Sequence, residues 1–160
     1  MTNSIGEVVN NDVLFVTGSN TTEAHPVIGS KMRQAVKKGA KLIVADPRRI
    51  DLATDADVFI QIKPGTNVAL LNGIMNVVLI EELYDKEYIE NRTEKFDELV
   101  EAIKDFTPEM AAEICGVKAD DIRKAARIYA SGDKAGIFYA MGITQHSSGT
   151  EHVKSIANLA

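Results

Sequence analysis

Four short segments of the chain carry glycine, polar or charged side chains directly after an apolar run. They are residues 18–23, 46–49, 63–67 and 141–145. Main-chain N–H groups near glycine can face an anion, carboxylates can accept hydrogen bonds from sugar hydroxyls, and cations can contact phosphate. These groups are the ones that bind nucleotides in α/β proteins. A nucleotide-shaped ligand is therefore the leading hypothesis.

The first segment, residues 18–23, precedes a predicted helix and begins with Gly18. Loop and helix N–H groups in such a place can face an anion. The segment is neither a G-x-G-x-x-G fingerprint nor a phosphate-binding loop with a lysine. A plain turn with a capping residue explains it equally well. Its candidate contacts are Asn20 and Glu23, of which Glu23 could bind a base or sugar or simply interact with the helix dipole.

The second segment places Asp46 at the carboxyl end of a predicted strand. A carboxylate in that position can accept hydrogen bonds from two ribose hydroxyls. The alternative is a turn role in the Asp-Pro pair. Arg48, with Arg49, could hold a phosphate through paired N–H groups. Either arginine could instead form a surface ion pair with Asp51 or Asp55.

The remaining two segments repeat this arrangement after two further strands. Lys63 supplies positive charge, and Gly65 permits close approach of the backbone to a ligand. Asn67 could reach a base edge or cap the helix that follows. The last segment contributes three more candidates: Met141, Gly142 and Gln145. Four such loops at one edge of a sheet would be stronger evidence for a site than any one of them.

The elements that must position these loops are short apolar strands separated by helical patterns. The predicted strands are residues 13–16, 41–45, 58–62 and 135–139. One helix over residues 23–38, with Pro26 in its first turn, and a long apolar helix over residues 67–83 fit the intervals. Residues 84–130 contain only helical patterns. The sequence therefore predicts an α/β fold in which residues 1–160 form a single Rossmann-like three-layer domain, with a mostly parallel sheet and an all-helical segment (84–130) inserted before the last strand.

Composition excludes several classes of function. The 160 residues are 45% hydrophobic and 26% charged, as in ordinary globular proteins. A net charge of −5 argues against nucleic-acid polymers as partners, because phosphate backbones select a basic face. No apolar run is long enough for membrane insertion. The single cysteine, Cys115, excludes an internal disulfide and is interpreted as a small buried residue, so we expect a cytoplasmic protein.

No catalytic or metal-binding constellation emerges from the residue types and their spacing. The three histidines, His25, His146 and His152, lack the spacing of metal ligands, because His146 and His152 are six residues apart, too far for one helical face at consecutive turns. No serine, histidine and acid follow one another in a suggestive context. The chain is therefore expected to bind a ligand and to leave the reaction to residues elsewhere.

Four motifs, taken in order, resemble one enzyme family. Residues 16–26, 45–49, 63–72 and 139–146 are similar to the molybdopterin oxidoreductase family, most closely to the catalytic (alpha) subunits of formate dehydrogenases. The resemblance implies an internal fragment of a larger subunit that oxidises formate to carbon dioxide. It also implies a bis-molybdopterin guanine dinucleotide cofactor with molybdenum or tungsten, an iron–sulfur cluster elsewhere in the parent chain, and electron-transfer subunits as partners.

The same resemblance implies that this piece grips one guanine nucleotide arm of the cofactor. Glu23 and Asp46 would serve ribose hydroxyls or guanine N–H groups, while Arg48 and Lys63 would face the charge of the arm. The full set of implied cofactor-binding residues is Gly18, Asn20, Glu23, Asp46, Arg48, Lys63, Gly65, Asn67, Met141, Gly142 and Gln145. No residue here matches the metal-ligating cysteine or selenocysteine of the family, nor its substrate-side arginine, so the isolated chain is expected to be inactive.

Two other functions stay open on the sequence alone. The chain could be a stand-alone module that binds a purine nucleotide without catalysis. It could also be a purely structural α/β domain, in which case replacing Asp46 would leave nucleotide affinity unchanged.

Overall fold

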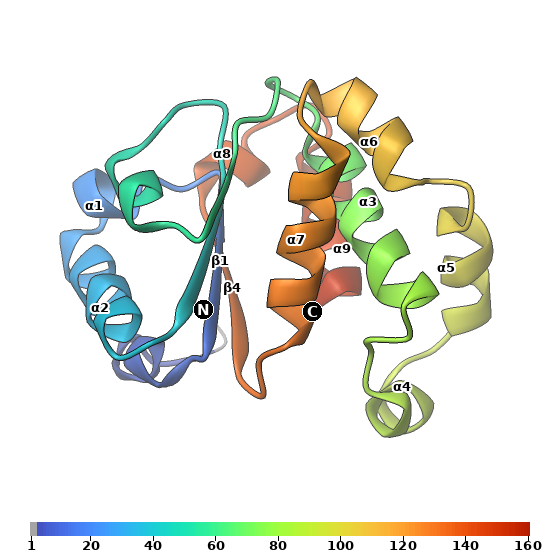
Figure 1. Ribbon diagram of the computed structural model, residues 1–160, viewed down its shortest axis with the longest axis horizontal. Helices are drawn as coiled ribbons and strands as arrows, with labels where there is room; N and C mark the ends of the chain where they lie inside the picture. The colour runs from blue at the N-terminus through green and yellow to red at the C-terminus, as the bar shows by residue number, and fades with distance from the viewer. Residues whose placement is uncertain (1–2) are drawn as a thin grey trace.

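A computed structural model describes residues 3–160, and it shows a parallel sheet between two layers of helices (Figure 1). The strands are β1 (Val13–Thr17), β2 (Lys41–Ala45), β3 (Val58–Ile60) and β4 (Ala135–Tyr139), and they are arranged in the order β3-β2-β1-β4. All three pairings are parallel. The predicted fold class is confirmed, although the third strand ends at Ile60 rather than at Ile62.

The strand order reverses beside β1, the first strand of the chain. β1 pairs with β2 from Val13↔Lys41 and with β4 from Val13↔Ala135. The chain moves outward from β1 to β3, then returns to the far side of β1 as β4. In open α/β sheets, ligands bind at the carboxyl ends of the strands where the order reverses. The topology therefore directs attention to the loops that follow β1 and β4.

One face of the sheet packs against η1 (Ile5–Asn10), α2 (Pro26–Lys37) and η2 (Asp51–Asp55). Successive side chains of a strand point to opposite faces, so alternate strand residues supply each core. Leu14 and Val16 of β1 lie in this cluster with Leu42 and Met32. Both faces of β1 are buried, which explains why its sequence is a continuous apolar run.

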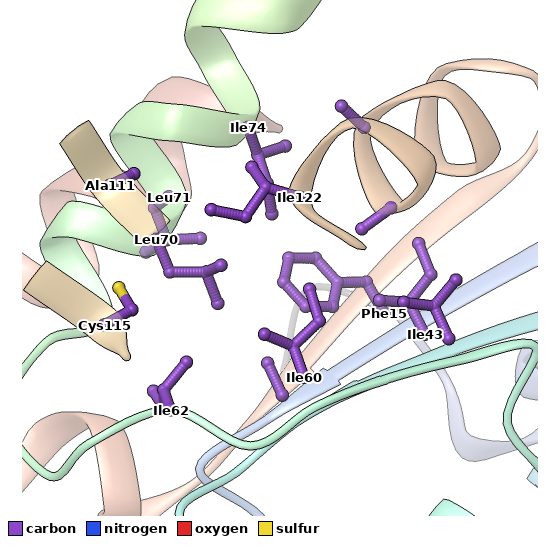
Figure 2. Packing of buried hydrophobic residues seen from close by; sticks show 14 of the residues in the cluster. Phe15, Ile43, Ile60, Ile62, Leu70, Leu71, Ile74, Ala111, Cys115 and Ile122 are labelled. Atoms are coloured by element: carbon purple, nitrogen blue, oxygen red, sulfur yellow. The ribbon is translucent and has the colours of Figure 1, made fainter. Parts of the chain in front are cut away.

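The opposite face packs against α3 (Asn67–Ile80), α6 (Pro108–Cys115), α7 (Ala119–Ala130) and α9 (Gly149–Leu159). Figure 2 shows Phe15, Ile43 and Ile60 from the strands packed toward Leu70 and Ile122 from the helices. Residue 15 thus contributes to this core while its neighbours in β1 contribute to the other one.

The helical segment before β4 consists of α4 (Lys86–Arg92), α5 (Phe96–Ile103), α6 and α7. Its helix boundaries follow local capping chemistry. The side chains of Asp85 and Thr107 accept hydrogen bonds from main-chain N–H groups at the start of α4 and α6. Gly116 ends α6 in the left-handed conformation that favours glycine. The predicted all-helical insertion is therefore confirmed.

The prediction of one helix over residues 23–38 is wrong. The chain forms α1 (Thr21–Ala24) and then α2, with a break at His25. His25 has φ −140 because the ring of Pro26 disfavours the α conformation of the residue before it, and Pro26 then serves as the first residue of α2. The long apolar helix also ends earlier than predicted, at Ile80. A short helix, α8 (Met141–Thr144), follows β4.

We predict that α3 and α6 depend on the small size of residues 73 and 111. A Cβ atom at Gly73 would lie 2.6 Å from the Cβ of Ala111. Gly73→Ala should therefore lower the free energy of unfolding by about 1–2 kcal/mol, although alanine favours helix. Ala111→Gly should relieve the clash, so the two changes together should cost less than the sum of the single changes. Urea unfolding measures all three variants, and simple additivity would contradict this packing.

Candidate functional site

The four polar segments lie along one edge of the sheet, because all four strands run in the same direction. We call the edge formed by residues 18–23, 46–49, 61–67 and 140–145 the carboxyl rim. In Figure 1 it is the upper edge, where α8 lies. The structure thus brings every predicted site residue to one edge and leaves none at the opposite one.

Gly18 and Gly142 join the first and last of these loops by direct backbone contact. The N–H of Gly142 donates a hydrogen bond to the carbonyl oxygen of Gly18 over 3.0 Å. A Cβ atom at Gly142 would lie 2.5 Å from that same oxygen, and Gly18 has φ +55. Close approach of the two loops therefore requires both glycines. The sequence interpretation, which assigned them to ligand approach, missed this contact because it arises only from the pairing of β1 with β4.

A buried histidine that the sequence interpretation set aside holds the loop after β4. His152 of α9 is 1% exposed, and its Nδ1 lies 3.0 Å from the carbonyl oxygen of Ile143. Because a carbonyl oxygen only accepts, Nδ1 carries the proton. The other ring nitrogen, Nε2, then accepts a hydrogen bond from the Ser148 hydroxyl over 3.0 Å. His152 thus connects α9 to the carboxyl rim.

His146 and His152 lie close together, although their six-residue separation does not fit one helical face. Their ring centroids are 5.1 Å apart, and Nε2 of His146 donates to the carbonyl oxygen of Gly142 over 2.9 Å. The turn between α8 and α9 brings the rings together, which a comparison with a single helical face could not predict. Within residues 3–160, no group of three or more histidine, cysteine, aspartate or glutamate side chains is arranged to hold a metal ion.

The structure shows the turn role that the sequence suggested for Asp46. The side chain is buried, with 5% of the residue exposed, and Oδ1 accepts a hydrogen bond from the N–H of Arg48 over 2.8 Å. This contact is the predicted turn role. Among the described residues, the carboxylate has no other hydrogen bond and no cationic partner. A second carboxylate oxygen therefore stays available to a ligand.

The alternative that Arg48 or Arg49 pairs with the nearby aspartates is wrong. Arg33 of α2 binds both Asp51 and Asp55, at 2.7 and 2.8 Å. The hydrogen bonds that Arg33 donates to the carboxylates of Asp55 and Asp51 raise the pKa of its guanidinium. The guanidinium of Arg49 lies 5.8 Å from the ring centre of Phe59, over the face of the ring. Arg48 is exposed and forms no ion pair within residues 3–160.

The segment after β3 forms a tight turn that ends at the start of α3. Gly65 has φ +84, and the Thr66 N–H and hydroxyl both donate to the carbonyl oxygen of Lys63, over 3.3 and 2.7 Å. Thr66, rather than Asn67, is the residue before the first turn of α3, so the capping role considered for Asn67 is wrong.

Asn67 is a largely buried residue whose side-chain amide still reaches the surface at this rim. The residue is 4% exposed, and in the part of the chain that the structure describes its amide forms no hydrogen bond. The polar side-chain atom that is fully buried without a partner in residues 3–160 is Oδ1 of Asn76, so the amide of Asn67 keeps access to solvent or to a ligand. An amide with both donors and an acceptor free is suited to the edge of a base.

The other predicted residues lie at the surface of the rim. Asn20 accepts a hydrogen bond from the Thr22 hydroxyl over 3.1 Å. Glu23, Met141 and Gln145 are exposed, Met141 to 64%, and their side chains have no hydrogen bond or ion pair within residues 3–160. The thioether of Met141 offers an apolar surface between polar neighbours.

Two hollows in the surface lie beside α2 rather than among Asp46, Lys63 and Asn67. One of about 240 Å³ lies at the amino edge of the sheet, where Asp12 and Lys38 are among its lining residues. The other lies along α2 and is lined by Arg33 and Lys37, among others. We assign no ligand to either, because the first lies at the edge opposite the converging loops and Arg33 is already neutralised by two aspartates. No helix in residues 3–160 has the length and hydropathy that a membrane crossing requires.

Comparison with known proteins gives concordant results. The family model described as molybdopterin oxidoreductase matches residues 1–160. The chain is 49% identical to the F420-dependent formate dehydrogenase subunit alpha of Methanocaldococcus jannaschii, over all of this chain and 24% of that protein. It is 44% identical to formate dehydrogenase H of Escherichia coli, over all of this chain and 22% of that protein.

A solved structure shares the fold. Acetylene hydratase from Pelobacter acetylenicus superposes with a TM-score of 0.89 at 34% identity, over 93% of this chain and 21% of that one. The chain thus spans about a quarter of the length of the curated relatives described above.

We predict that His152 contributes more to stability than His146, although the two rings are in contact. His152→Ala would leave the Ile143 carbonyl without its donor and create a cavity, so it should lower the free energy of unfolding by about 2–4 kcal/mol. His146 is exposed, and His146→Ala, the matched control, should cost less than about 1 kcal/mol. Chemical denaturation measures both variants, and equal losses would contradict the anchoring role of His152.

Proposed function

Because the chain belongs to the molybdopterin oxidoreductase family, we propose that its carboxyl rim binds one guanine nucleotide arm of a bis-molybdopterin guanine dinucleotide cofactor. One observation carries this proposal. The largely buried residues Asp46 and Asn67 follow neighbouring strands at the same rim, and the Asp46 carboxylate and the Asn67 amide both keep hydrogen-bonding capacity that no described residue uses.

The residues at the rim fit the chemical groups of such an arm. Guanine presents N–H donors and a carbonyl acceptor, which a carboxylate and an amide can match. Asp46, with Glu23, is assigned to ribose hydroxyls or guanine N–H groups, and Asn67 to the edge of the base. Arg48 and Lys63 are assigned to the phosphates, since neither forms an ion pair with a described carboxylate.

The remaining assigned residues shape the rim rather than supply charge. They are Gly18, Asn20, Gly65, Met141, Gly142 and Gln145. When bound, the cofactor supplies the redox chemistry of molybdenum or tungsten. In this proposal the residues of the present chain bind and orient the nucleotide arm, and we assign no proton transfer to any of them.

For the whole enzyme we propose oxidation of formate to carbon dioxide. The support is the identity of 49% and 44% to two formate dehydrogenases. Acetylene hydratase, which by its name acts on acetylene, shares this fold at 34% identity, so the rim alone does not select the substrate. The proposal includes further domains that enclose the cofactor, an iron–sulfur cluster in the parent chain and electron-transfer subunits. It places the enzyme in the cytoplasm, in keeping with a single buried cysteine.

The first prediction of this proposal is selective binding of guanine nucleotides. Calorimetric titration should show tighter binding of GDP than of ADP or NAD. Asp46→Asn keeps the acceptor used by the Arg48 N–H but removes the charge, so it should weaken GDP binding by about tenfold or more. If Asp46 binds the ribose, this loss should be smaller with 2′-deoxy-GDP.

The control for this experiment is Asp12→Asn, which changes a carboxylate just before β1, at the opposite edge of the sheet. It should leave GDP affinity unchanged. A preference for NAD would favour a different nucleotide-binding module, and an unchanged affinity in Asp46→Asn would favour a purely structural role for the rim.

A further prediction concerns activity. The protein alone should reduce no redox dye with formate, because none of the assigned residues reacts with formate. A spectrophotometric dye assay tests this, with a complete formate dehydrogenase as the positive control. Formate-dependent dye reduction by the protein alone would contradict the division of roles proposed above.

A further inference from the structure

We propose that Cys115 and Gly116, where α6 ends, are positioning residues for the loop that carries Lys63, and that they hold this lysine at the carboxyl rim for a phosphate-bearing ligand. The inference rests on the proposed function, and it gives the helical segment (84–130) a role in binding. No residue of that segment appears among the predicted contacts.

The backbone of α6 holds the loop after β3 at two points. The N–H of Lys63 donates to the carbonyl oxygen of Cys115 over 2.9 Å, and the Cys115 thiol donates to the carbonyl oxygen of Thr66 over 3.5 Å. Cys115 is the last residue of α6, and the final carbonyls of a helix have no partner within the helix. The N–H of Lys63 therefore gives the last carbonyl group of α6 a hydrogen-bond donor. In return, α6 holds the turn between Lys63 and Thr66 at both of its ends.

The burial of Cys115 keeps this connection in place. The residue is 0% exposed, and in Figure 2 its sulfur lies at the edge of the core near Leu70 and Leu71. Burial raises the pKa of the Cys115 thiol, with an opposing effect of the charge on Lys63. The thiol therefore stays protonated at neutral pH and remains a hydrogen-bond donor to Thr66.

Gly116 leaves the space that the Lys63 side chain occupies. A Cβ atom at residue 116 would lie 2.6 Å from Cε of Lys63 and 3.2 Å from its Nζ. The lysine stem thus passes directly over this glycine. Since the clashing atoms belong to the flexible end of a side chain, a larger residue at 116 would displace the ammonium group rather than the fold. Gly116 has φ +72, and asparagine tolerates this region better than other residues with a side chain.

The position of Lys63 also admits a purely structural role. The negative end of the α6 dipole attracts an ammonium group, so Lys63 could stabilise α6 without any ligand. The structural role and the ligand-binding role of Lys63 predict different effects of replacing it. A structural lysine affects the free energy of unfolding, whereas a lysine held for a ligand affects nucleotide affinity, and only the second couples Gly116 to affinity through Lys63.

A double-mutant cycle on GDP affinity tests the inference. Lys63→Met should weaken GDP binding by roughly three- to tenfold, the effect of one partly exposed charge on a phosphate. Gly116→Asn should produce a similar loss, and the double variant should lose no more than either single one. The control is Gly39→Asn, which places the same residue at another positive φ (+107) with nothing within 4 Å, and it should leave affinity unchanged. Amide hydrogen exchange at Lys63 should stay slow in Gly116→Asn, which shows that the backbone contact to Cys115 persists.

If GDP binds and Lys63→Met weakens it but Gly116→Asn does not, the positioning role is wrong and the proposed function stands. Multiplicative losses in the double variant would also overturn the inference, because Gly116 would then act independently of Lys63. If Lys63→Met changes only the unfolding free energy, Lys63 is structural and the inference fails. If the wild-type protein binds no guanine nucleotide, the proposed function fails and the inference fails with it.

Discussion

Parallel strand direction is the constraint on which the site depends. Every strand of the sheet ends at the same edge, so loops from residues 18 to 145 converge although they are far apart in sequence. The hydrogen bond between Gly142 and Gly18 then joins the loops on either side of the point where strand order reverses. Two further hydrogen bonds hold this rim in place: His152 binds the loop after β4, and the end of α6 binds the loop after β3.

The charge that the carboxyl rim presents to a ligand depends on which of its charged side chains form ion pairs with the rest of the fold. Arg33 takes both Asp51 and Asp55, so these acids do not compete for Arg48. Asp46 uses one oxygen in its own turn and Asn67 is not needed as a cap. The protein has a net charge of −5, yet Arg48, Arg49 and Lys63 at this edge have no carboxylate partner among the described residues. The local arrangement, rather than the net charge, therefore suits an anionic ligand.

Much of the fold could be predicted because its signals are local. The continuous apolar run of β1, Pro108 after Thr107 and the glycine at 116 each determine an element directly. The break at His25 was also in principle local, since Pro26 restricts the residue before it. The contacts that shape the site were not predictable in the same way. The pairing of Gly18 with Gly142, the meeting of His146 with His152 and the contact of Lys63 with Gly116 all join segments whose proximity exists only after the sheet has formed.

In the proposed function, the four loops after the strands bind one nucleotide together. Mapping of amide chemical shifts by NMR during titration with GDP tests this most directly. We expect the amides that shift to lie in residues 18–23, 46–49, 63–67 and 141–145 and to respond with one dissociation constant. Shifts confined to the hollow at the amino edge, around Asp12 and Lys38, would contradict it.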